Sequence, residues 1–169
     1  MDAEEFDDFY TASFDRLVAQ IYAMVGDRDE AQECVQEAFV RAWSHRRQLA
    51  QARAPEAWVR TTAYRLAVSR WRRTVLSRRS PDRALQHRSH GVDPGPDHVA
   101  LVAALAQLPE AQRRAIVLHH MCDLPVSAVA AEMGAPEGTI KARLSRGRAA
   151  LLSLLDEGPS GLTEGASHA

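Results

Sequence analysis

Residues 55–79 place aromatic rings next to positive charge, a combination that suits single-stranded nucleic acid. The stretch alternates three aromatic side chains with five arginines, namely Trp58, Arg60, Tyr64, Arg65, Arg70, Trp71, Arg72 and Arg73. Aromatic rings stack on unpaired bases at about 1–3 kcal/mol per base, while arginines follow the phosphates. A tryptophan on a helix of a small bundle is more often a core residue, so composition alone leaves both interpretations open.

Residues 124–148 have the pattern of a DNA-binding helix-turn-helix. Val126, Val129 and Ala130 give a short first helix its buried face, and Gly134 supplies the turn at low steric cost. Ile140 and Leu144, four residues apart, direct a second helix into the core. The other sides of that second helix carry polar and basic side chains: Thr139, Lys141, Arg143, Ser145, Arg146 and Arg148. Entry into the major groove requires an exposed basic helix of this kind, although an ordinary amphipathic helix with solvated arginines has the same pattern.

A third stretch, residues 27–44, has the opposite charge. Its polar face consists of Glu30, Glu33, Gln36 and Glu37. A polar helix face of this kind is usually only solvated. The more specific alternative is a docking surface for a basic partner. Composition does not decide between the two.

Nothing in the sequence predicts catalysis, a metal site or a cofactor. His119, His120 and Cys122 are near one another, but adjacent histidines on a helix point about 100° apart and lack the i, i+4 spacing of a shared ligand pair. The other cysteine, Cys34, is distant, and two cysteines are too few for a disulfide scaffold. The sequence contains no glycine-rich phosphate loop and no nucleophile elbow.

The charge distribution separates these stretches. The chain of 169 residues has a net charge of −1, which by itself argues against nucleic acid. Residues 1–40, however, hold eleven acidic residues and two arginines, and residues 41–90 hold thirteen arginines and two acidic residues. Residues 91–169 hold six basic and nine acidic residues. Such asymmetry indicates segments that face different partners. The single lysine among 21 basic residues fits arginine's preference for phosphates and fits a GC-rich genome equally well.

The elements that must position these residues are predicted to be helices throughout. Apolar residues recur every three or four positions in seven segments: 6–25, 27–43, 55–79, 99–108, 109–118, 125–133 and 136–155. Asp27 is predicted to cap the second helix with Glu30 as its capping-box partner, and Pro55 to begin the third. Residues 48–54 are predicted to be a break between helices, and no strand is predicted.

We therefore predict an all-α protein with two small helical domains joined by a flexible linker. The boundaries are 1–79 for the first domain, 80–97 for the linker, 98–157 for the second domain and 158–169 for a disordered tail. The linker holds three prolines and two glycines, and each proline inside a helix costs about 3 kcal/mol.

The sequence also predicts a cytoplasmic protein without membrane insertion. No apolar run approaches the roughly 20 residues that cross a bilayer. The acidic N-terminus lacks the basic and then apolar pattern of a signal peptide.

Three segments resemble parts of the bacterial extracytoplasmic-function (ECF, group IV) sigma factors of the sigma-70 family. Residues 29–43 look like the polymerase-binding part of region 2, and residues 57–73 resemble its promoter-melting and promoter-reading part. Residues 108–115, with the helix-turn-helix after them, resemble region 4. The segments occur in the order and with the spacing of that family over about residues 5–155. The resemblance implies a helical region 2 domain followed by a helix-turn-helix region 4 domain.

In region 2, the resemblance implies a protein-docking surface and a DNA-binding surface. The acidic helix face matches the surface that docks on the clamp helices of RNA polymerase's largest subunit, through Glu33, Gln36, Glu37 and Arg41. The arginine-rich helix and the loop before it match the part that opens the −10 promoter element and holds the melted non-template strand. The residues so implied are Arg53, Trp58, Arg65, Ser69, Arg70, Arg72 and Arg73, with Trp58 and Arg65 beside a flipped base. Arg65 stands where the family has an asparagine-like polar residue.

In region 4, the resemblance implies contacts with the −35 promoter element. Lys141, Ser145 and Arg146 match base-reading positions of the recognition helix, and Thr139 and Arg143 match phosphate contacts. The flap of polymerase's second-largest subunit is implied as a further partner, and an anti-sigma factor is another candidate. The linker is expected to run toward the catalytic cleft and the RNA exit path.

The sequence thus predicts an RNA polymerase sigma factor that binds core polymerase, recognises both promoter elements in duplex DNA and promotes melting. Two alternatives belong to different classes. One is a stand-alone helix-turn-helix transcriptional regulator with an unrelated N-terminal domain, and the other is an adaptor for a signalling protein.

Overall fold

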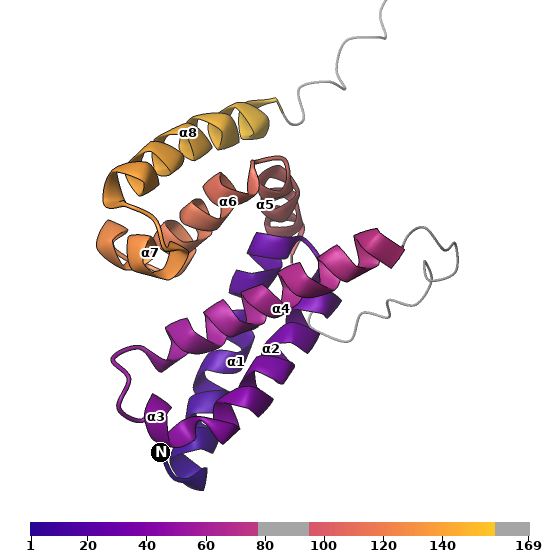
Figure 1. Cartoon of the computed structure of the whole chain (residues 1–169). Coiled ribbons are helices and arrows are strands. Elements are labelled where there is room, and N and C mark those ends of the chain that lie inside the picture. The colour runs from indigo at the N-terminus through magenta and orange to yellow at the C-terminus, as the bar shows by residue number, and fades with distance from the viewer. Residues whose placement is uncertain (78–94, 158–169) are drawn as a thin grey trace, which may run out of the picture. The chain divides into compact units, whose positions relative to one another are not determined.

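All regular secondary structure in the described part of the chain is helical. The computed structural model describes residues 1–77 and 95–157. The chain divides into two compact units, 1–95 and 96–169. The predicted all-α fold with two helical domains is therefore confirmed (Figure 1).

The described residues of the first unit form three long helices and one short one. They are α1 (Ala3–Val25), α2 (Arg28–Ser44), α3 (Arg46–Leu49) and α4 (Pro55–Ser77). The three long helices pack against one another in every pairing, so they form a three-helix bundle, with α4 lying along α1 and α2 (Figure 1). Pro55 begins α4, as its fixed φ predicts.

Polar caps fix where α1 and α2 begin. Asp2 accepts a hydrogen bond from the Glu5 backbone N–H at 2.9 Å and donates its own N–H to the Glu5 carboxylate at 2.8 Å, which completes a capping box. Gly26 ends α1 with a φ of 79°, a left-handed conformation that glycine adopts without a steric penalty. The Asp27 carboxylate then accepts from the Glu30 N–H at 3.0 Å, so the predicted cap of α2 is confirmed.

The apolar stripes of the three long helices meet in a closed core. Leu17 and Ile21 from α1, Val35 from α2, and Val59 and Ala63 from α4 have no exposed surface. Fully burying a Leu, Ile or Val side chain contributes about 1.5–3 kcal/mol. This burial fixes which sides of α2 and α4 remain exposed.

Phe39 of α2 attaches the first half of α1 to the bundle. Its ring is 3% exposed and lies within 6.2 Å, between ring centroids, of four aromatic rings. All four belong to α1: Phe6, Phe9, Tyr10 and Phe14. Tilted and edge-on pairs of this kind add about 0.5–1.5 kcal/mol each beyond their buried area.

The second unit contains four α-helices and one π-helical turn. They are α5 (Pro96–Ala106), α6 (Glu110–Ile116), η1 (Val117–Met121), α7 (Val126–Met133) and α8 (Glu137–Asp156). The helix α8 packs against α5, α6 and α7, so it organises the unit. Side chains from all parts of the unit form its core, including Leu105, Leu118, Val129, Ile140 and Leu144, which are at most 2% exposed.

Two details of the second unit differ from the sequence prediction. The helix α5 begins at Pro96, inside the predicted linker, because a proline at the first helical position has a suitable φ and needs no N–H partner. The helix predicted over 109–118 passes into the π-helical turn η1, whose wider turns leave the apolar pattern nearly unchanged. The rest of the predicted linker, 80–94, and the predicted tail, 158–169, lie outside the described residues.

Candidate functional site

The second unit contains the predicted helix-turn-helix. Val129 and Ala130 of α7 are buried, whereas Val126 in its first turn is only half-buried. Gly134 ends that helix in a left-handed conformation with a φ of 62°. Glycine is favoured there because a side chain in this conformation is strained. Ile140 and Leu144 then anchor the N-terminal half of α8 in the core. The helix α8 is therefore held with its other sides exposed.

Four of the five predicted −35 residues lie on the exposed part of α8. They are Thr139, Lys141, Ser145 and Arg146. Arg143 is half-buried, because its position lies nearer the core stripe of Ile140 and Leu144. The structure thus brings these hydroxyl-bearing and basic side chains together on one exposed surface over the first three turns of α8. Arg143 lies at the margin of that surface.

Arg148, which the sequence pattern also put on this basic side, is turned back on its own helix. Its Nε donates to the Leu144 carbonyl at 3.2 Å. The bond uses only the Nε of Arg148, which is exposed like Arg146.

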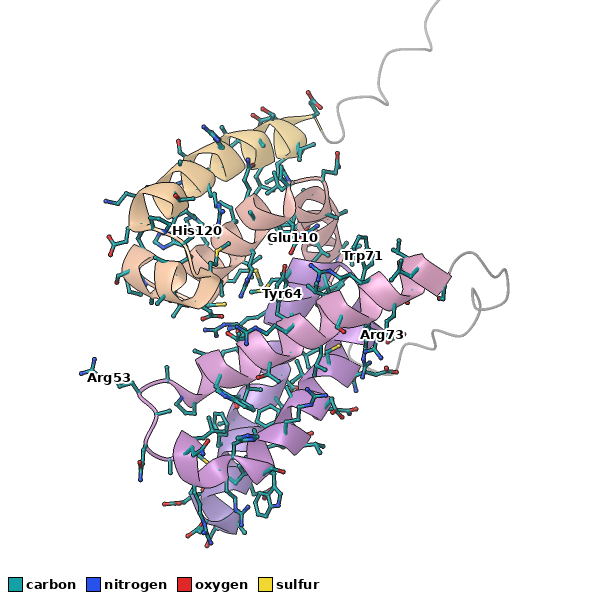
Figure 2. All side chains as sticks on the ribbon, viewed as in Figure 1. Arg53, Tyr64, Trp71, Arg73, Glu110 and His120 are labelled. Atoms are coloured by element: carbon teal, nitrogen blue, oxygen red, sulfur yellow. The ribbon has the colours of Figure 1, made fainter. Side chains whose placement is uncertain are left out.

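The helix α4 presents a continuous exposed face with four of the predicted −10 residues. Arg65, Ser69, Arg72 and Arg73 are exposed at spacings of three, four and eight, which places them on one side of the helix. Figure 2 shows Arg73 near the C-terminal end of α4 and Arg53 extending away from the turn that precedes it. The face combines three positive charges and one hydroxyl, a composition that suits phosphates.

Other members of the aromatic and arginine pattern belong to the core. Arg60 is 4% exposed, and its Nη1 donates to the Gln20 side-chain oxygen at 3.2 Å across α4 and α1. Tyr64 is 7% exposed. Trp71, in contrast, is 65% exposed (Figure 2). The interleaved pattern in the sequence therefore combines two structural roles, core packing and an exposed basic surface.

Trp58 lies beside a surface cavity that the sequence did not predict. Its ring is half-buried, with its centroid 5.4 Å from that of His45. The cavity has a volume of about 290 Å³ and is lined by Ser44, His45, Arg46, Arg47 and Gln48. It is formed where α2 passes into α3, earlier than the predicted loop of 48–54. That loop is shorter than predicted because its first two residues are the end of α3.

Trp43, at the end of α2, makes a cation–π contact with Arg46. The Arg46 guanidinium carbon lies 4.1 Å from the ring centroid of Trp43, and Arg46 Nη1 donates to the Trp43 carbonyl at 2.9 Å. Trp43 is 40% exposed and its other neighbour is Phe6, at 5.1 Å between ring centroids. Cation–π contact and the hydrogen bond together hold Arg46 at the cavity.

The predicted docking face of α2 is accessible. Glu33, Gln36 and Arg41 are exposed, and the side chain of Glu37 is 39% exposed. Arg41 Nε donates to Glu37 Oε1 at 2.9 Å, one helical turn away. Val40, 66% exposed, lies among these polar residues at the helical spacing of four from Gln36. The face therefore combines acidic groups with an apolar centre.

Arg70 connects the two surfaces of the first unit. Its Nη1 donates to Glu33 Oε2 at 2.9 Å and lies 3.5 Å from Glu30 Oε1. The predicted −10 residue Arg70 is thus turned toward α2, away from the face of Arg65 and Arg72. The sequence could not reveal this pairing, because it depends on how α2 and α4 pack.

The buried thiol of Cys34 holds Glu30, the second carboxylate that Arg70 contacts. Cys34 Sγ donates to Glu30 Oε1 at 3.3 Å. Burial, and then the negative charge of Glu30, raise the pKa of Cys34 to about 12. Glu30, predicted to return a capping bond to Asp27, directs its carboxylate to this thiol and to Arg70 instead.

The two histidines in η1, His119 and His120, contact each other, and His119 also contacts the backbone. His119 Nδ1 is 2.8 Å from the Leu124 carbonyl, and the ring centroids of His119 and His120 are 4.8 Å apart. Partial desolvation of the exposed His120 ring, followed by the charges of His119 and Arg148, lowers the pKa of His120. Among residues 1–77 and 95–157, no three His, Cys, Asp or Glu side chains are grouped as metal ligands.

None of the helices in residues 1–77 or 95–157 is sufficiently long and apolar to cross a membrane.

Two family models match the chain, one on each unit. Sigma-70 region 2 matches residues 9–76, and Sigma-70, region 4 matches residues 98–151. The first covers the bundle with the acidic and arginine-rich faces, and the second covers the helix-turn-helix.

Two relatives match most of this chain over most of their own length. The ECF RNA polymerase sigma factor SigL of Mycobacterium tuberculosis is 30% identical over 140 residues, which are 79% of this chain and 79% of SigL. The ECF RNA polymerase sigma factor SigW of Bacillus subtilis is 28% identical over 170 residues, 89% of this chain and 88% of SigW.

Solved structures have the same architecture. The sigma factor RpoE of Bartonella quintana, crystallised with the anti-sigma factor NepR, aligns with a TM-score of 0.78 and 25% identity over 93% of this chain and 100% of that one. CnrH, solved with the cytosolic domain of CnrY, has a TM-score of 0.65 at 18% identity over 94% of this chain and 92% of CnrH, which shows a shared fold.

Proposed function

Because this chain belongs to the ECF sigma factors of RNA polymerase, we propose a role for each of its exposed surfaces in transcription initiation. A sigma factor binds core polymerase, recognises the −10 and −35 promoter elements and promotes melting. The observation that carries the assignment is the order of the two family regions on two separate helical units. A stand-alone helix-turn-helix regulator is not favoured, since it accounts for the second unit alone.

The acidic face of α2 is proposed to dock on the clamp helices of polymerase's largest subunit. Glu33, Gln36 and Glu37 supply negative charge and an amide for a basic partner, and Arg41 orients Glu37 at 2.9 Å. Val40 supplies exposed apolar area at the centre, in the arrangement of an apolar core with a polar rim that specific interfaces use. Electrostatic complementarity of this kind also speeds association.

The exposed face of α4, with the turn before it, is proposed to contact the melted −10 element. Ser69, Arg72 and Arg73 offer donors to the phosphates of one strand. Trp58 with Arg65, and the cavity next to His45, offer a place for an extruded base, and Arg53 in the loop before α4 is a further contact to the strand. Extrusion costs a few kcal/mol of lost stacking, which a preformed pocket offsets.

The exposed side of α8 is proposed to read the −35 element in the major groove. Lys141, Ser145 and Arg146 are assigned to base edges, and Thr139 and the half-buried Arg143 to phosphates. The flap of polymerase's second-largest subunit is proposed as the protein partner of this unit.

Three further features complete the proposal. The chain acts in the cytoplasm and has no catalytic activity of its own. It requires no cofactor. An anti-sigma factor is a candidate regulator, since RpoE of Bartonella quintana forms such a complex.

Run-off transcription tests the function. Purified full-length chain is added to core polymerase with genomic promoter fragments, and specific transcripts are expected that core polymerase alone does not produce. Matched fragments with an altered −35 element are expected to lose them. If the chain neither co-purifies with core polymerase nor directs specific transcripts, the function is wrong.

A further inference from the structure

One ion-pair cluster joins the surface proposed for polymerase to the helix proposed for DNA. The Arg70 guanidinium from α4 lies 2.9 Å from Glu33 and 3.5 Å from Glu30, both on α2. The side chains of Arg70, Glu30 and Glu33 are 33%, 26% and 65% exposed, so the cluster is at the surface and a ligand can reach it.

The charge of the cluster disfavours a phosphate in the free protein. One guanidinium and two carboxylates leave a net charge of −1 at this point of the surface. A phosphate that approaches Arg70 therefore also approaches two negative groups, and the repulsion offsets the attraction. The neighbouring Ser69 and Arg73 are exposed on the same helix, so DNA bound to them passes close to Arg70.

The two carboxylates are not equally free to move. Glu30 is held by the Cys34 thiol at 3.3 Å and lies in the first turn of α2, where a negative charge is favourable. Glu33 is 65% exposed against 26% for Glu30, and it makes the shorter contact with Arg70. A basic partner that binds the acidic face of α2 therefore competes with Arg70 mainly for Glu33.

We infer that Arg70 is a coupling residue: Glu33 and Glu30 neutralise it in the free protein, and core polymerase, by engaging Glu33, releases it to a promoter phosphate. This inference rests on the proposed function of both surfaces. Coupling between two binding events is reciprocal. Binding of DNA to Arg70 accordingly frees Glu33 and raises the affinity for polymerase.

The test measures DNA binding by the full-length chain in the absence of polymerase, using a fluorescent single-stranded oligonucleotide of random sequence. Glu33→Gln keeps the shape of the side chain and removes its charge. It is expected to raise the affinity about two- to fivefold, the range that one exposed ion pair carries. The slope of log affinity against log salt is expected to steepen by about 0.7, the value for one added single-strand phosphate contact.

Glu37→Gln is the matched control. Glu37 lies one turn further along the same face and pairs with Arg41 of its own helix. It is expected to leave the affinity for the oligonucleotide within error of the original chain. If both substitutions raised the affinity for the oligonucleotide equally, the change in net charge alone would explain the effect, and the coupling would be overturned.

A double-mutant cycle isolates the role of Arg70. In the Arg70→Gln background, Glu33→Gln is expected to have no effect on DNA affinity, because the residue that it releases is absent. A gain that persists without Arg70 overturns the inference. Glu30→Gln, in the original background, provides a second variant with the same expected direction.

Failure of the coupling can be told apart from failure of the proposed function. If the original chain binds core polymerase and initiates transcription while Glu33→Gln leaves free DNA binding unchanged, only the coupling is wrong. If the original chain binds neither polymerase nor DNA, the proposed function itself is wrong.

Discussion

Gly147 of α8 lies against Ile116 of α6 so closely that a Cβ at position 147 would be 2.9 Å from Ile116 Cγ1 and 3.3 Å from its Cδ1. Ile116 is 5% exposed and has little room to move. The absence of a side chain at Gly147 therefore determines how close α8, with its exposed basic side, comes to α6.

Gly147→Ala is expected to destabilise the second unit by about 1 kcal/mol. Overpacking costs about 1–3 kcal/mol, and the better helix propensity of alanine returns up to about 1 kcal/mol. Gly138→Ala is the control, because no atom lies within 4 Å of its added Cβ, and it is expected to stabilise by about 0.5 kcal/mol. Hydrogen exchange of α6 and α8 amides measures both. Equal protection in the two variants would contradict the close contact.

Glu37→Arg is expected to weaken binding to core polymerase about tenfold or more, because like charges brought together at an interface cost several kcal/mol. Folding should be little affected, since the exposed pair with Arg41 contributes about 0.2–1 kcal/mol. Binding is measured by fluorescence anisotropy with labelled core polymerase, and folding by thermal denaturation. Asp8→Arg, a charge reversal on an exposed position of α1, is the control. Unchanged affinity of Glu37→Arg would remove Glu37 from the docking face.

Arg146→Ala is expected to weaken binding of the holoenzyme to promoters with the matching −35 element by about 1–3 kcal/mol and to relax specificity at one base pair. Arg143→Ala, at the margin of the exposed surface, should weaken binding to all sequences alike and reduce the salt dependence. Competition assays over single-base variants of the −35 element separate the two outcomes. A uniform loss with Arg146→Ala would make that residue a phosphate contact.

Cys34 is expected to resist alkylation in the folded protein, because it is fully buried and its pKa is raised to about 12. Cys122 is half-buried and should react first. Iodoacetamide treatment followed by peptide mass spectrometry gives the two rates. The unfolded chain is the control, in which both thiols should react alike, and rapid labelling of Cys34 in the folded chain would contradict its burial.

The second unit is expected to lose stability as the pH falls through the usual histidine range, about 6.5. The pKa of His120 is lower in the folded state than in the unfolded state. Below the usual histidine pKa the unfolded state therefore binds more protons at this site, and the free energy of unfolding falls as the pH falls. The loss should be smaller in His120→Gln. Thermal denaturation at several pH values measures it, and an identical pH profile in the two proteins would exclude His120 as a cause.

Local signals in the sequence were sufficient to predict most of the fold. Asp27 and Gly26 mark a helix boundary through their own hydrogen bonds and backbone conformation, and the spacing of Ile140 and Leu144 identifies the buried side of α8. Such features depend on neighbours within one helical turn, which the sequence displays directly.

The remaining features depend on contacts between helices. Arg60 and Arg65 look alike in the sequence, yet one is buried against Gln20 and the other is exposed. Arg70 was predicted to face DNA and pairs with Glu33, 37 positions away. Only the packing of α4 on α1 and α2 distinguishes these three arginines. The helix α3 was missed because four residues are too few to show an apolar period.

Each unit buries an apolar core of its own, around Leu17 and Ile21 in one and around Leu118 and Ile140 in the other. A destabilising change in one core therefore does not remove the packing of the other. Under the roles proposed for the two surfaces, the exposed residues of α8 can change, and the preferred upstream element with them, while α2 retains its surface for polymerase. Separate cores would then make promoter preference a trait that selection can alter without disturbing assembly.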